Sequence, residues 1–457
     1  MNTHSPRDCV MFNGRAHFDR CQSAAGFFNN LAMWALTACV FLPTFLATGA
    51  YAEQSKKKAP SATVKSTSDE KNAKQAPQVR QIALFHAGLN AIHSYRVPGI
   101  VKTPSGVLFA YCEGRRNDHS DWGEIEIHSR RSVDGGATWE APRQVAHFGK
   151  RFEGNPTKRR GGETEQTAHS PTAVITAEGR ILILYCLNYS RCFAIESPDD
   201  GISFSAPREI TNTFDRFRPE VPWSSIATGP GHGICTSEGR LIVPVWLAYG
   251  HTGALRPSVV STIYSDDNGQ SWRNGNVAIT NEGKVQNPAE AAIAQLADGS
   301  IILNARSESR VGRRITTKSA DGDRGWSQPR FDPDLAEPIC QGSLLTLSDG
   351  RLVFVNPRWL RTTVAGTEIP GARAERKNLT VHVSSDGGSS WAIKKTLEEN
   401  ESAYSDLVEL NDREIGVLYE RGKQIIFATI DKSWLEGPAE DSIAVDQDKK
   451  SLPAEKP

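Results

Sequence analysis

The sequence lacks an excess of charge of either sign, because 53 lysine and arginine residues balance 53 aspartate and glutamate residues in a chain of 457. A chain without a basic field does not favour nucleic acid as a partner. Cysteine and histidine do not occur at the spacing of a zinc site, so we predict no metal ligands and no cofactor. No amphipathic helical pattern of useful length is present, which leaves strands as the main element.

Long hydrophobic runs are also scarce. The N-terminal region holds one such run, at 31–46. It follows basic residues and precedes the small-residue segment Ala50-Tyr51-Ala52, so we interpret 1–52 as a signal peptide. This predicts a protein that is exported and is then periplasmic, envelope-associated or secreted. The alternative is a retained anchor, with membrane contact only through this segment, but Pro43 interrupts a run already short for a bilayer.

Residues 53–80 and 438–457 have few side chains to bury, so we predict a disordered linker and a disordered tail around one domain at 81–437. Cleavage after Ala52 leaves five of the 8 cysteines, and an odd number cannot all pair. Cys186 and Cys192 flank a short loop between two predicted strands. They are the candidates for a disulfide in an oxidising compartment, and the sequence leaves open whether they are bridged.

An octet of the form Ser-x-Asp-x-Gly-x-Ser/Thr-Trp occurs first at Ser132 to Trp139 and recurs with variations at starting positions 197, 265, 319 and 384. Its aspartate can accept backbone N–H groups across a tight turn, its glycine supplies the required backbone angles, and its aromatic ring packs between strands. Five copies at intervals of 54 to 68 residues indicate a repeat architecture.

A second periodic signal is a turn residue followed by a dense apolar run, as in Gly106 to Tyr111. Six such runs, 51 to 73 residues apart, begin at 106, 179, 239, 299, 350 and 413. Each period has room for four short strands, and radial stacking of such sheets buries their faces. We therefore predict an all-β, six-bladed β-propeller, with the octets at the outer rim and the chemistry near the six runs, taken as the inner strands. A β-sandwich is the alternative, but it does not explain why the two signals alternate.

Several polar residues lie where a core is expected. Arg96, Arg306 and Arg376 each flank a predicted strand. Guanidiniums that converge on one anion imply a ligand that always carries a negative charge. Glu290 is a carboxylate in apolar company, and a buried carboxylate needs a reason. Tyr404 alone is ordinarily a packing residue.

The charged loop at 113–123 holds two candidate proton donors, Asp118 and Asp121. A loop of this composition is most often solvated surface. Either aspartate becomes a proton donor if the loop folds over the channel mouth and removes water.

Taken together, Tyr95-Arg96-Val97-Pro98, the octets, Leu303 to Arg306, Ala403 to Leu407 and Leu418 to Glu420 resemble an exo-α-sialidase of the bacterial and animal neuraminidase family. The resemblance runs in order from about residue 90 to 435, and it implies sialylated glycans as the partners. Octets also occur in unrelated propellers, whereas the full ordered set is specific.

The resemblance implies a role for each matched residue. Arg96, Arg306 and Arg376 form the triad that holds the sialic acid carboxylate. Further expectations are that Glu420 supports Arg96, that Arg115 reaches the 4-hydroxyl of the sugar, and that three residues carry the reaction: the acid/base Asp121, the nucleophile Tyr404 and its base Glu290.

Some points stay open in the sequence. Ala289 stands where the family commonly has asparagine, so Glu282 is the alternative base. The segment around Tyr189 is expected to line the pocket for the N-acyl or glycerol arm. Alternative functions are a non-catalytic propeller that binds sialoglycans and a hydrolase or transferase for a related nonulosonic acid.

Overall fold

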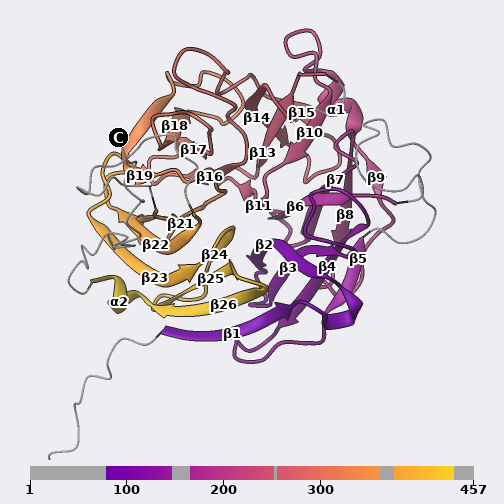
Figure 1. The fold of residues 1–457 in the computed structure, drawn as a ribbon, viewed down its shortest axis with the longest axis vertical. Coiled ribbons are helices and arrows are strands. Elements are labelled where there is room, and N and C mark those ends of the chain that lie inside the picture. The colour runs from indigo at the N-terminus through magenta and orange to yellow at the C-terminus, as the bar shows by residue number, and fades with distance from the viewer. Residues whose placement is uncertain (1–78, 147–164, 252–254, 360–374, 437–457) are drawn as a thin grey trace, which may run out of the picture. The chain divides into compact units, whose positions relative to one another are not determined.

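The computed structural model describes residues 79–146, 165–251, 255–359 and 375–436. These residues form six sheets arranged around a common axis, so the fold is the predicted six-bladed β-propeller (Figure 1). The predicted signal peptide at 1–52, the linker up to residue 78 and the tail at 438–457 lie outside the described residues. Within the described ranges, no helix is long and apolar enough to cross a membrane.

Each blade is built around four antiparallel strands that follow one another outward from the axis. The first blade contains β2 (Ser94–Lys102), β3 (Leu108–Arg115), β4 (Ile125–Ser132) and β5 (Arg143–Ala146). The second contains β6 (Ala168–Ile175), β7 (Ile181–Leu187), β8 (Arg191–Ser197) and β9 (Arg208–Glu209), with β11 (Gly231–His232) parallel to β6. The third contains β10 (Ser225–Thr228), β13 (Leu241–Ala248), β14 (Ser258–Ser265) and β15 (Arg273–Asn274), with β12 (Ile234–Cys235) paired to β13.

The last three blades repeat this plan. The fourth contains β16 (Ala291–Gln295), β17 (Ile301–Ala305), β18 (Arg313–Ser319) and β19 (Arg330–Ala336), and the fifth contains β20 (Ser343–Thr346), β21 (Leu352–Pro357), β22 (Lys377–Ser384) and β23 (Ile393–Glu401). The sixth contains β24 (Ser405–Glu409), β25 (Glu414–Arg421), β26 (Gln424–Asp431) and, as its outer strand, β1 (Val79–His86). The first and last strands thus share one sheet, which closes the ring. Short helical segments are η1 (Leu89–Ala91), α1 (Thr211–Asp215) and α2 (Lys432–Glu436).

The six apolar runs form the second strand of each blade, and the expectation that they are the innermost strands is wrong. The first strands, such as β2, β6 and β24, contact one another around the axis. A second strand is covered by neighbouring sheets on both faces, so all eight residues of β3 are buried and most are apolar. The first strand borders the channel, and this allows it to carry polar residues.

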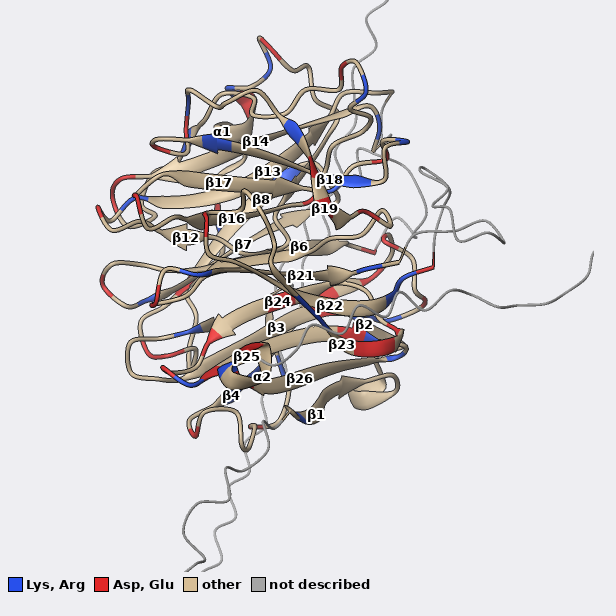
Figure 2. Cartoon of the chain, turned by 90° about the vertical axis from the view of Figure 1, so that its left-hand side faces the viewer, with Lys and Arg blue, Asp and Glu red and all other residues tan. Residues whose placement is uncertain are grey.

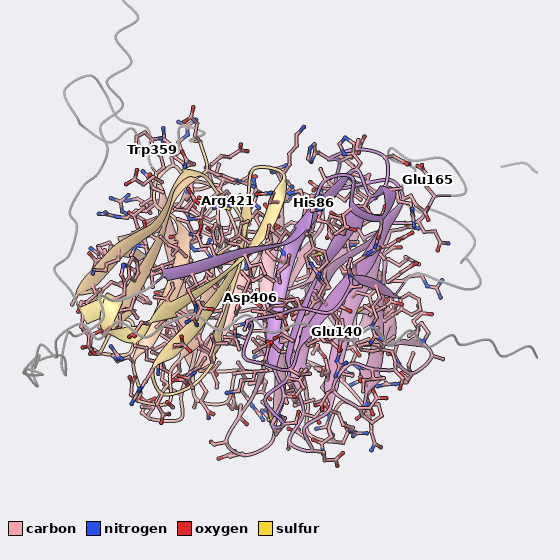
Figure 3. All side chains as sticks on the ribbon, turned by 90° about the horizontal axis from the view of Figure 1, so that it is seen from below. His86, Glu140, Glu165, Trp359, Asp406 and Arg421 are labelled. Carbon is pink, nitrogen blue, oxygen red and sulfur yellow. The ribbon has the colours of Figure 1, made fainter. Side chains whose placement is uncertain are left out.

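A buried aspartate joins several blades near the axis. Asp406, labelled in Figure 3, is 1% exposed. Its carboxylate accepts the backbone N–H of Ile100 at 2.9 Å, contacts His232 Nδ1 at 2.7 Å and accepts the Ser343 hydroxyl at 2.8 Å. These partners come from the first, second and fifth blades, so a single side chain in the sixth blade fixes the first strands relative to one another.

The octets form turns between the third and fourth strands, at the outer side of the blades, as predicted. In the first, Ser132 Oγ accepts the Gly136 N–H at 2.9 Å, and Asp134 accepts the N–H of Thr138 at 2.9 Å and its hydroxyl at 2.5 Å. The same bonds recur in the octets that begin at 197, 265 and 384. The divergent octet at 319 still directs a backbone N–H, that of Gly322, to its serine.

Charged residues of both signs are interspersed over the loops and strand ends (Figure 2). Many form surface ion pairs, such as Arg80 with Glu414 at 2.8 Å and Arg240 with Asp266 at 2.7 Å. The face in this view therefore carries no field of a single sign.

The aspartates of the octets are expected to stabilise the fold in a way that is lost at low pH. Hydrogen bonds from Thr138 and Ser203 lower the pKa of Asp134 and of Asp199 to about 2. A carboxylate with a lowered pKa stabilises the fold above its unfolded pKa of about 3.9, and this contribution is lost as the pH falls through the folded value. We expect Asp134→Asn with Asp199→Asn to lower Tm at pH 6 and to flatten the fall of Tm between pH 4 and 2, measured by circular dichroism.

The matched control is Asp412→Asn, in an exposed turn between β24 and β25. It should leave the pH dependence of Tm unchanged. Parallel curves for the double variant and the parent would contradict the role of the octet carboxylates.

Candidate functional site

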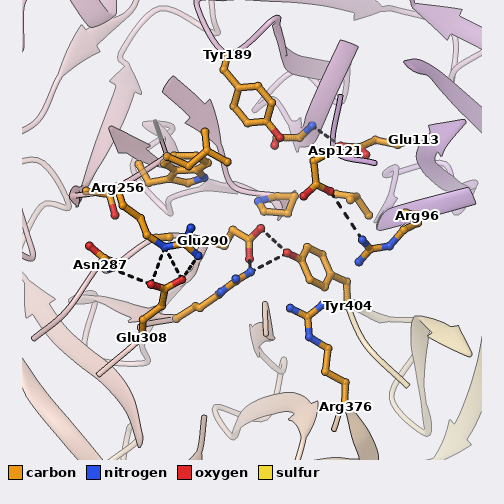
Figure 4. A pocket seen from close by; sticks show the side chains of 18 of the residues that line it. Arg96, Glu113, Asp121, Tyr189, Arg256, Asn287, Glu290, Glu308, Arg376 and Tyr404 are labelled. Atoms are coloured by element: carbon orange, nitrogen blue, oxygen red, sulfur yellow. Dashed lines mark hydrogen bonds and ion pairs between the residues drawn. The ribbon is translucent and has the colours of Figure 1, made fainter. Parts of the chain in front are cut away.

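A cavity of about 820 Å³ opens at the end of the axis where the first strands begin and the second strands end. Its volume falls in the range of small-molecule sites. Charged and aromatic side chains from all six blades line it, including Arg96, Arg115, Tyr189, Trp246, Arg256, Glu290, Arg306, Arg376 and Tyr404 (Figure 4). The propeller therefore gathers residues that are far apart in the sequence at one mouth.

Arg96 enters this cavity from β2, where the pairing with β3 shifts register between Arg96 and Gly99. Glu420 of β25 holds it from behind, with Nε 3.3 Å from Oε1 and Nη2 3.1 Å from Oε2. Oε1 of Glu420 also accepts the N–H of Val97 at 2.7 Å, a residue whose φ of 59° is unusual for a β-branched side chain. Glu420 thus fixes both the guanidinium and the irregular backbone that presents it.

Three side chains meet at the phenol of Tyr404. The hydroxyl donates to Glu290 Oε1 at 2.5 Å and accepts a hydrogen bond from Arg306 Nη1 at 2.8 Å. Nη1 of Arg306 also lies 2.5 Å from Glu290 Oε2, which closes a triangle of contacts. Glu290 and Arg306 adjoin β16 and β17, and the N–H of Arg306 donates to the Glu290 carbonyl at 3.0 Å, so the strand register sets this geometry.

Arg376 completes the ring of guanidiniums. Its Cζ lies 5.4 Å from the centroid of the Tyr404 ring, and that of Arg96 lies 5.2 Å from the same centroid. Nη2 of Arg376 donates to the carbonyl of Ile339 at 2.6 Å, and within the described part of the chain no carboxylate forms an ion pair with it. An arginine that lines a cavity with no carboxylate partner is suited to an anionic ligand.

Asp121 lies across the cavity on the loop after β3. Its Oδ1 is 2.9 Å from Arg115 Nη1 and 3.9 Å from Arg96 Nη1. Arg115 is itself buried and donates to Glu113 Oε2 at 3.0 and 2.7 Å. Burial would raise the pKa of Asp121, but Arg115 and Arg96 outweigh it and hold the pKa below its ordinary value. In the free protein Asp121 is therefore ionised, and the exposure of 56% of its side chain to solvent also favours the charged form.

The phenol of Tyr404 is neutral in the free protein. Burial, and then the charge of Glu290, raise the pKa of Tyr404 well above its ordinary value, whereas the arginines around it lower the pKa by less. The hydroxyl therefore keeps its proton, and the short contact with Glu290 is the path by which it can be lost.

An aromatic wall stands beside Asp121. The ring of Tyr189, at the tip of the hairpin between β7 and β8, stacks on His169 with centroids 3.6 Å apart and contacts Trp122 at 4.5 Å. His169 accepts the N–H of Tyr189 at 3.1 Å through Nε2, and burial lowers the pKa of His169 to about 3, so this imidazole is neutral. The expectation that Tyr189 lines the cavity is confirmed.

The structure brings together the eight residues singled out in the sequence. Seven of them line the cavity and Glu420 lies behind Arg96. Two alternatives lie elsewhere: the carboxylate of Asp118 accepts the N–H of Ser120 within its own exposed loop, and Glu282 is exposed and does not line the cavity. The geometry thus favours Asp121 over Asp118 and Glu290 over Glu282.

The same cavity holds a polar cluster that was not predicted from the sequence. Arg256 Nε lies 2.8 and 2.6 Å from the two carboxylate oxygens of Glu308, and Asn287 Nδ2 donates to Glu308 Oε2 at 2.9 Å. The only signal is that Glu308 follows Arg306 by two residues. Nothing in the sequence around Arg256 indicates a site residue, because its partner Glu308 belongs to the next blade and comes close only in the folded protein. In the described residues, no group of three or more His, Cys, Asp or Glu is arranged to hold a metal ion.

Comparisons with known proteins identify a family and several similar chains. A family model described as a BNR repeat-like domain matches residues 157–417. A sialidase from Bacteroides fragilis (strain YCH46) is 28% identical over 372 residues, which are 74% of this chain and 62% of that protein. A sialidase from Micromonospora viridifaciens is 27% identical over 370 residues, which are 77% of this chain and 53% of that protein. The chain thus spans less than two thirds of the length of both relatives.

The fold is also similar to that of a solved sialidase structure. The Hadza microbial sialidase Hz136 is similar with a TM-score of 0.65 and 26% identity, over 78% of this chain and 69% of that chain.

Proposed function

Because the chain belongs to the sialidase family with BNR repeats, we propose that it is an exo-α-sialidase that hydrolyses terminal α-linked sialic acids of glycoconjugates with retention of anomeric configuration. One observation carries the proposal: three guanidiniums surround the Tyr404 phenol, which donates a hydrogen bond to Glu290. This combination binds an acid sugar and places a nucleophile beside it.

Substrate binding follows from charge. The carboxylate of sialic acid is ionised at neutral pH and accepts charge-assisted hydrogen bonds from Arg96, Arg306 and Arg376. Arg115, held by Glu113, faces the sugar ring from the opposite wall and donates to its 4-hydroxyl. The aromatic wall around Tyr189 lies next to this position and contacts the N-acyl or glycerol arm.

The nucleophile is a neutral phenol for an electrostatic reason. Sialic acid carries its carboxylate on the anomeric carbon, so an approaching aspartate or glutamate would be repelled. Tyr404 approaches as a neutral phenol, while the negative charge stays on Glu290, behind the hydroxyl at 2.5 Å. Glu290 takes the phenol proton only as the bond from the Tyr404 oxygen to the anomeric carbon forms. Sialidases with a tyrosine nucleophile are a known exception to the rule of two carboxylates among glycosidases.

Asp121 donates a proton to the leaving oxygen. In the free protein the guanidiniums of Arg115 and Arg96 lie 2.9 and 3.9 Å from the Asp121 carboxylate and lower its pKa. The substrate carboxylate adds one negative charge, partly neutralises the arginines that lower the pKa of Asp121, and the sugar covers its exposed side. Both effects raise this pKa, so substrate binding itself protonates the acid that the reaction needs.

Loss of the phenol hydroxyl tests the nucleophile. We expect Tyr404→Phe to lower kcat for release of umbelliferone from its sialoside at least about 1,000-fold, because Glu290 then has no proton to take and no covalent intermediate forms. The control is Tyr264→Phe in β14, which does not line the cavity and should keep parental activity. Activity of Tyr404→Phe within tenfold of the parent would contradict the role of Tyr404. A parent that binds sialosides without cleaving them would instead support the non-catalytic alternative.

The leaving group tests the acid. Umbelliferone departs with little protonation, whereas the sugar of sialyllactose needs a proton. We expect Asp121→Ala to lower kcat/KM for sialyllactose by about 100-fold or more and for the umbelliferyl sialoside by less than about tenfold. Both are measured by release of free sialic acid. Equal losses on the two substrates would show that Asp121 acts in binding and does not donate the proton.

A further inference from the structure

The hairpin between β7 and β8 carries two cysteines that the proposed reaction does not use. Cys186 and Cys192 are register partners on the two strands, and both are fully buried in one apolar cluster. Register partners point to the same face of a sheet, so the two sulfurs face each other. The structure holds both as free thiols.

The backbone hydrogen bonds of Cys192 show which type of antiparallel pair it forms with Cys186. Its N–H donates to Thr211 Oγ1 at 3.0 Å, and its carbonyl accepts the N–H of Ile210 at 2.8 Å, so both groups point away from β7. Cys186 and Cys192 therefore form a non-hydrogen-bonded antiparallel pair, whose Cα atoms lie about 4.5 Å apart. That separation falls within the range of roughly 4.4–6.8 Å that a disulfide spans.

The remaining cysteines of the described chain have no comparable neighbour. Cys112 lies in β3, Cys235 in β12 and Cys340 just before β20, so they belong to three different blades. The odd number of cysteines thus resolves into one matched pair and three single thiols.

We propose that Cys186 and Cys192 are the site of a cross-strand disulfide. It forms by exchange with a small disulfide such as oxidised glutathione: the Cys186–Cys192 bond forms, the glutathione S–S bond breaks, and two electrons and two protons leave as two glutathione thiols. Since both sulfurs are buried, the exchange takes place as the blade folds. The predicted export places the chain in a compartment where such a bond persists.

The bond has a consequence for the cavity. Residues at the hairpin tip, Asn188 and Tyr189, have positive φ values of 52° and 54°. Tyr189 packs against Trp122, which directly follows Asp121. The cysteine pair lies one register pair from this tip, next to Leu187 and Arg191. A covalent link there limits the movement of the tip and so holds the wall that supports the Asp121 loop.

The first test is chemical. The full chain is refolded in a glutathione redox buffer until its tryptophan fluorescence matches that of the native protein, then unfolded and treated with iodoacetamide, and its peptides are analysed by mass spectrometry. We expect the peptides of Cys186 and Cys192 to be linked with loss of two hydrogens, and Cys112, Cys235 and Cys340 to be alkylated. Alkylation of both Cys186 and Cys192 in the refolded protein would overturn the proposal.

The second test is thermal. Protein refolded with tris(2-carboxyethyl)phosphine should have a Tm roughly 3 °C below that of protein refolded in the glutathione redox buffer, because the loop constraint is absent. Cys186→Ala with Cys192→Ala should remove this dependence on reductant, and the control Cys112→Ala with Cys340→Ala should keep it. A shift that persists in the first variant would overturn the proposal. Neither test uses a sialoside, so the outcome is independent of the proposed function.

Discussion

The site depends on holding three positive guanidiniums close to one buried tyrosine although they repel one another. Each is held by a group of the protein: Arg96 by Glu420, Arg306 by Glu290, and Arg376 by the carbonyl of Ile339. In the proposed function the three guanidiniums share the carboxylate of the substrate. Binding of this anion would relieve their repulsion, so the arrangement of the arginines would itself contribute affinity for an acid group.

The propeller makes this arrangement possible by its topology. Every blade presents the start of its first strand and the end of its second strand to the same mouth. Loops and hairpin tips, which carry Asp121, Tyr189 and Arg256, complete the cavity wall. Closure of the ring by β1 and the buried contacts of Asp406 keep the blades in register. The distance of 2.5 Å between the Tyr404 hydroxyl and Glu290, which belong to different blades, requires that register.

Much of this could be predicted from the sequence, for physical reasons. The octets mark one turn per blade, since their serine and aspartate satisfy backbone N–H groups locally, and the apolar runs mark the doubly covered second strands. Arg96, Arg306 and Tyr404 stand in short segments whose order resembles a known family. The Arg256–Glu308 pair could not be predicted, because it joins two blades and its position depends on how they pack. The error about the innermost strands has the same origin: burial on both faces is visible in a sequence, whereas distance from the axis is not.

The central claim is that the three guanidiniums recognise the carboxylate of the substrate. The most direct measurement compares a non-hydrolysable α-thiosialoside with its methyl ester as competitive inhibitors of the same enzyme. The account predicts that the ester binds at least about 100-fold more weakly, since it removes the charge that the arginines share while it keeps every other group of the sugar. Equal inhibition by the acid and the ester would contradict it.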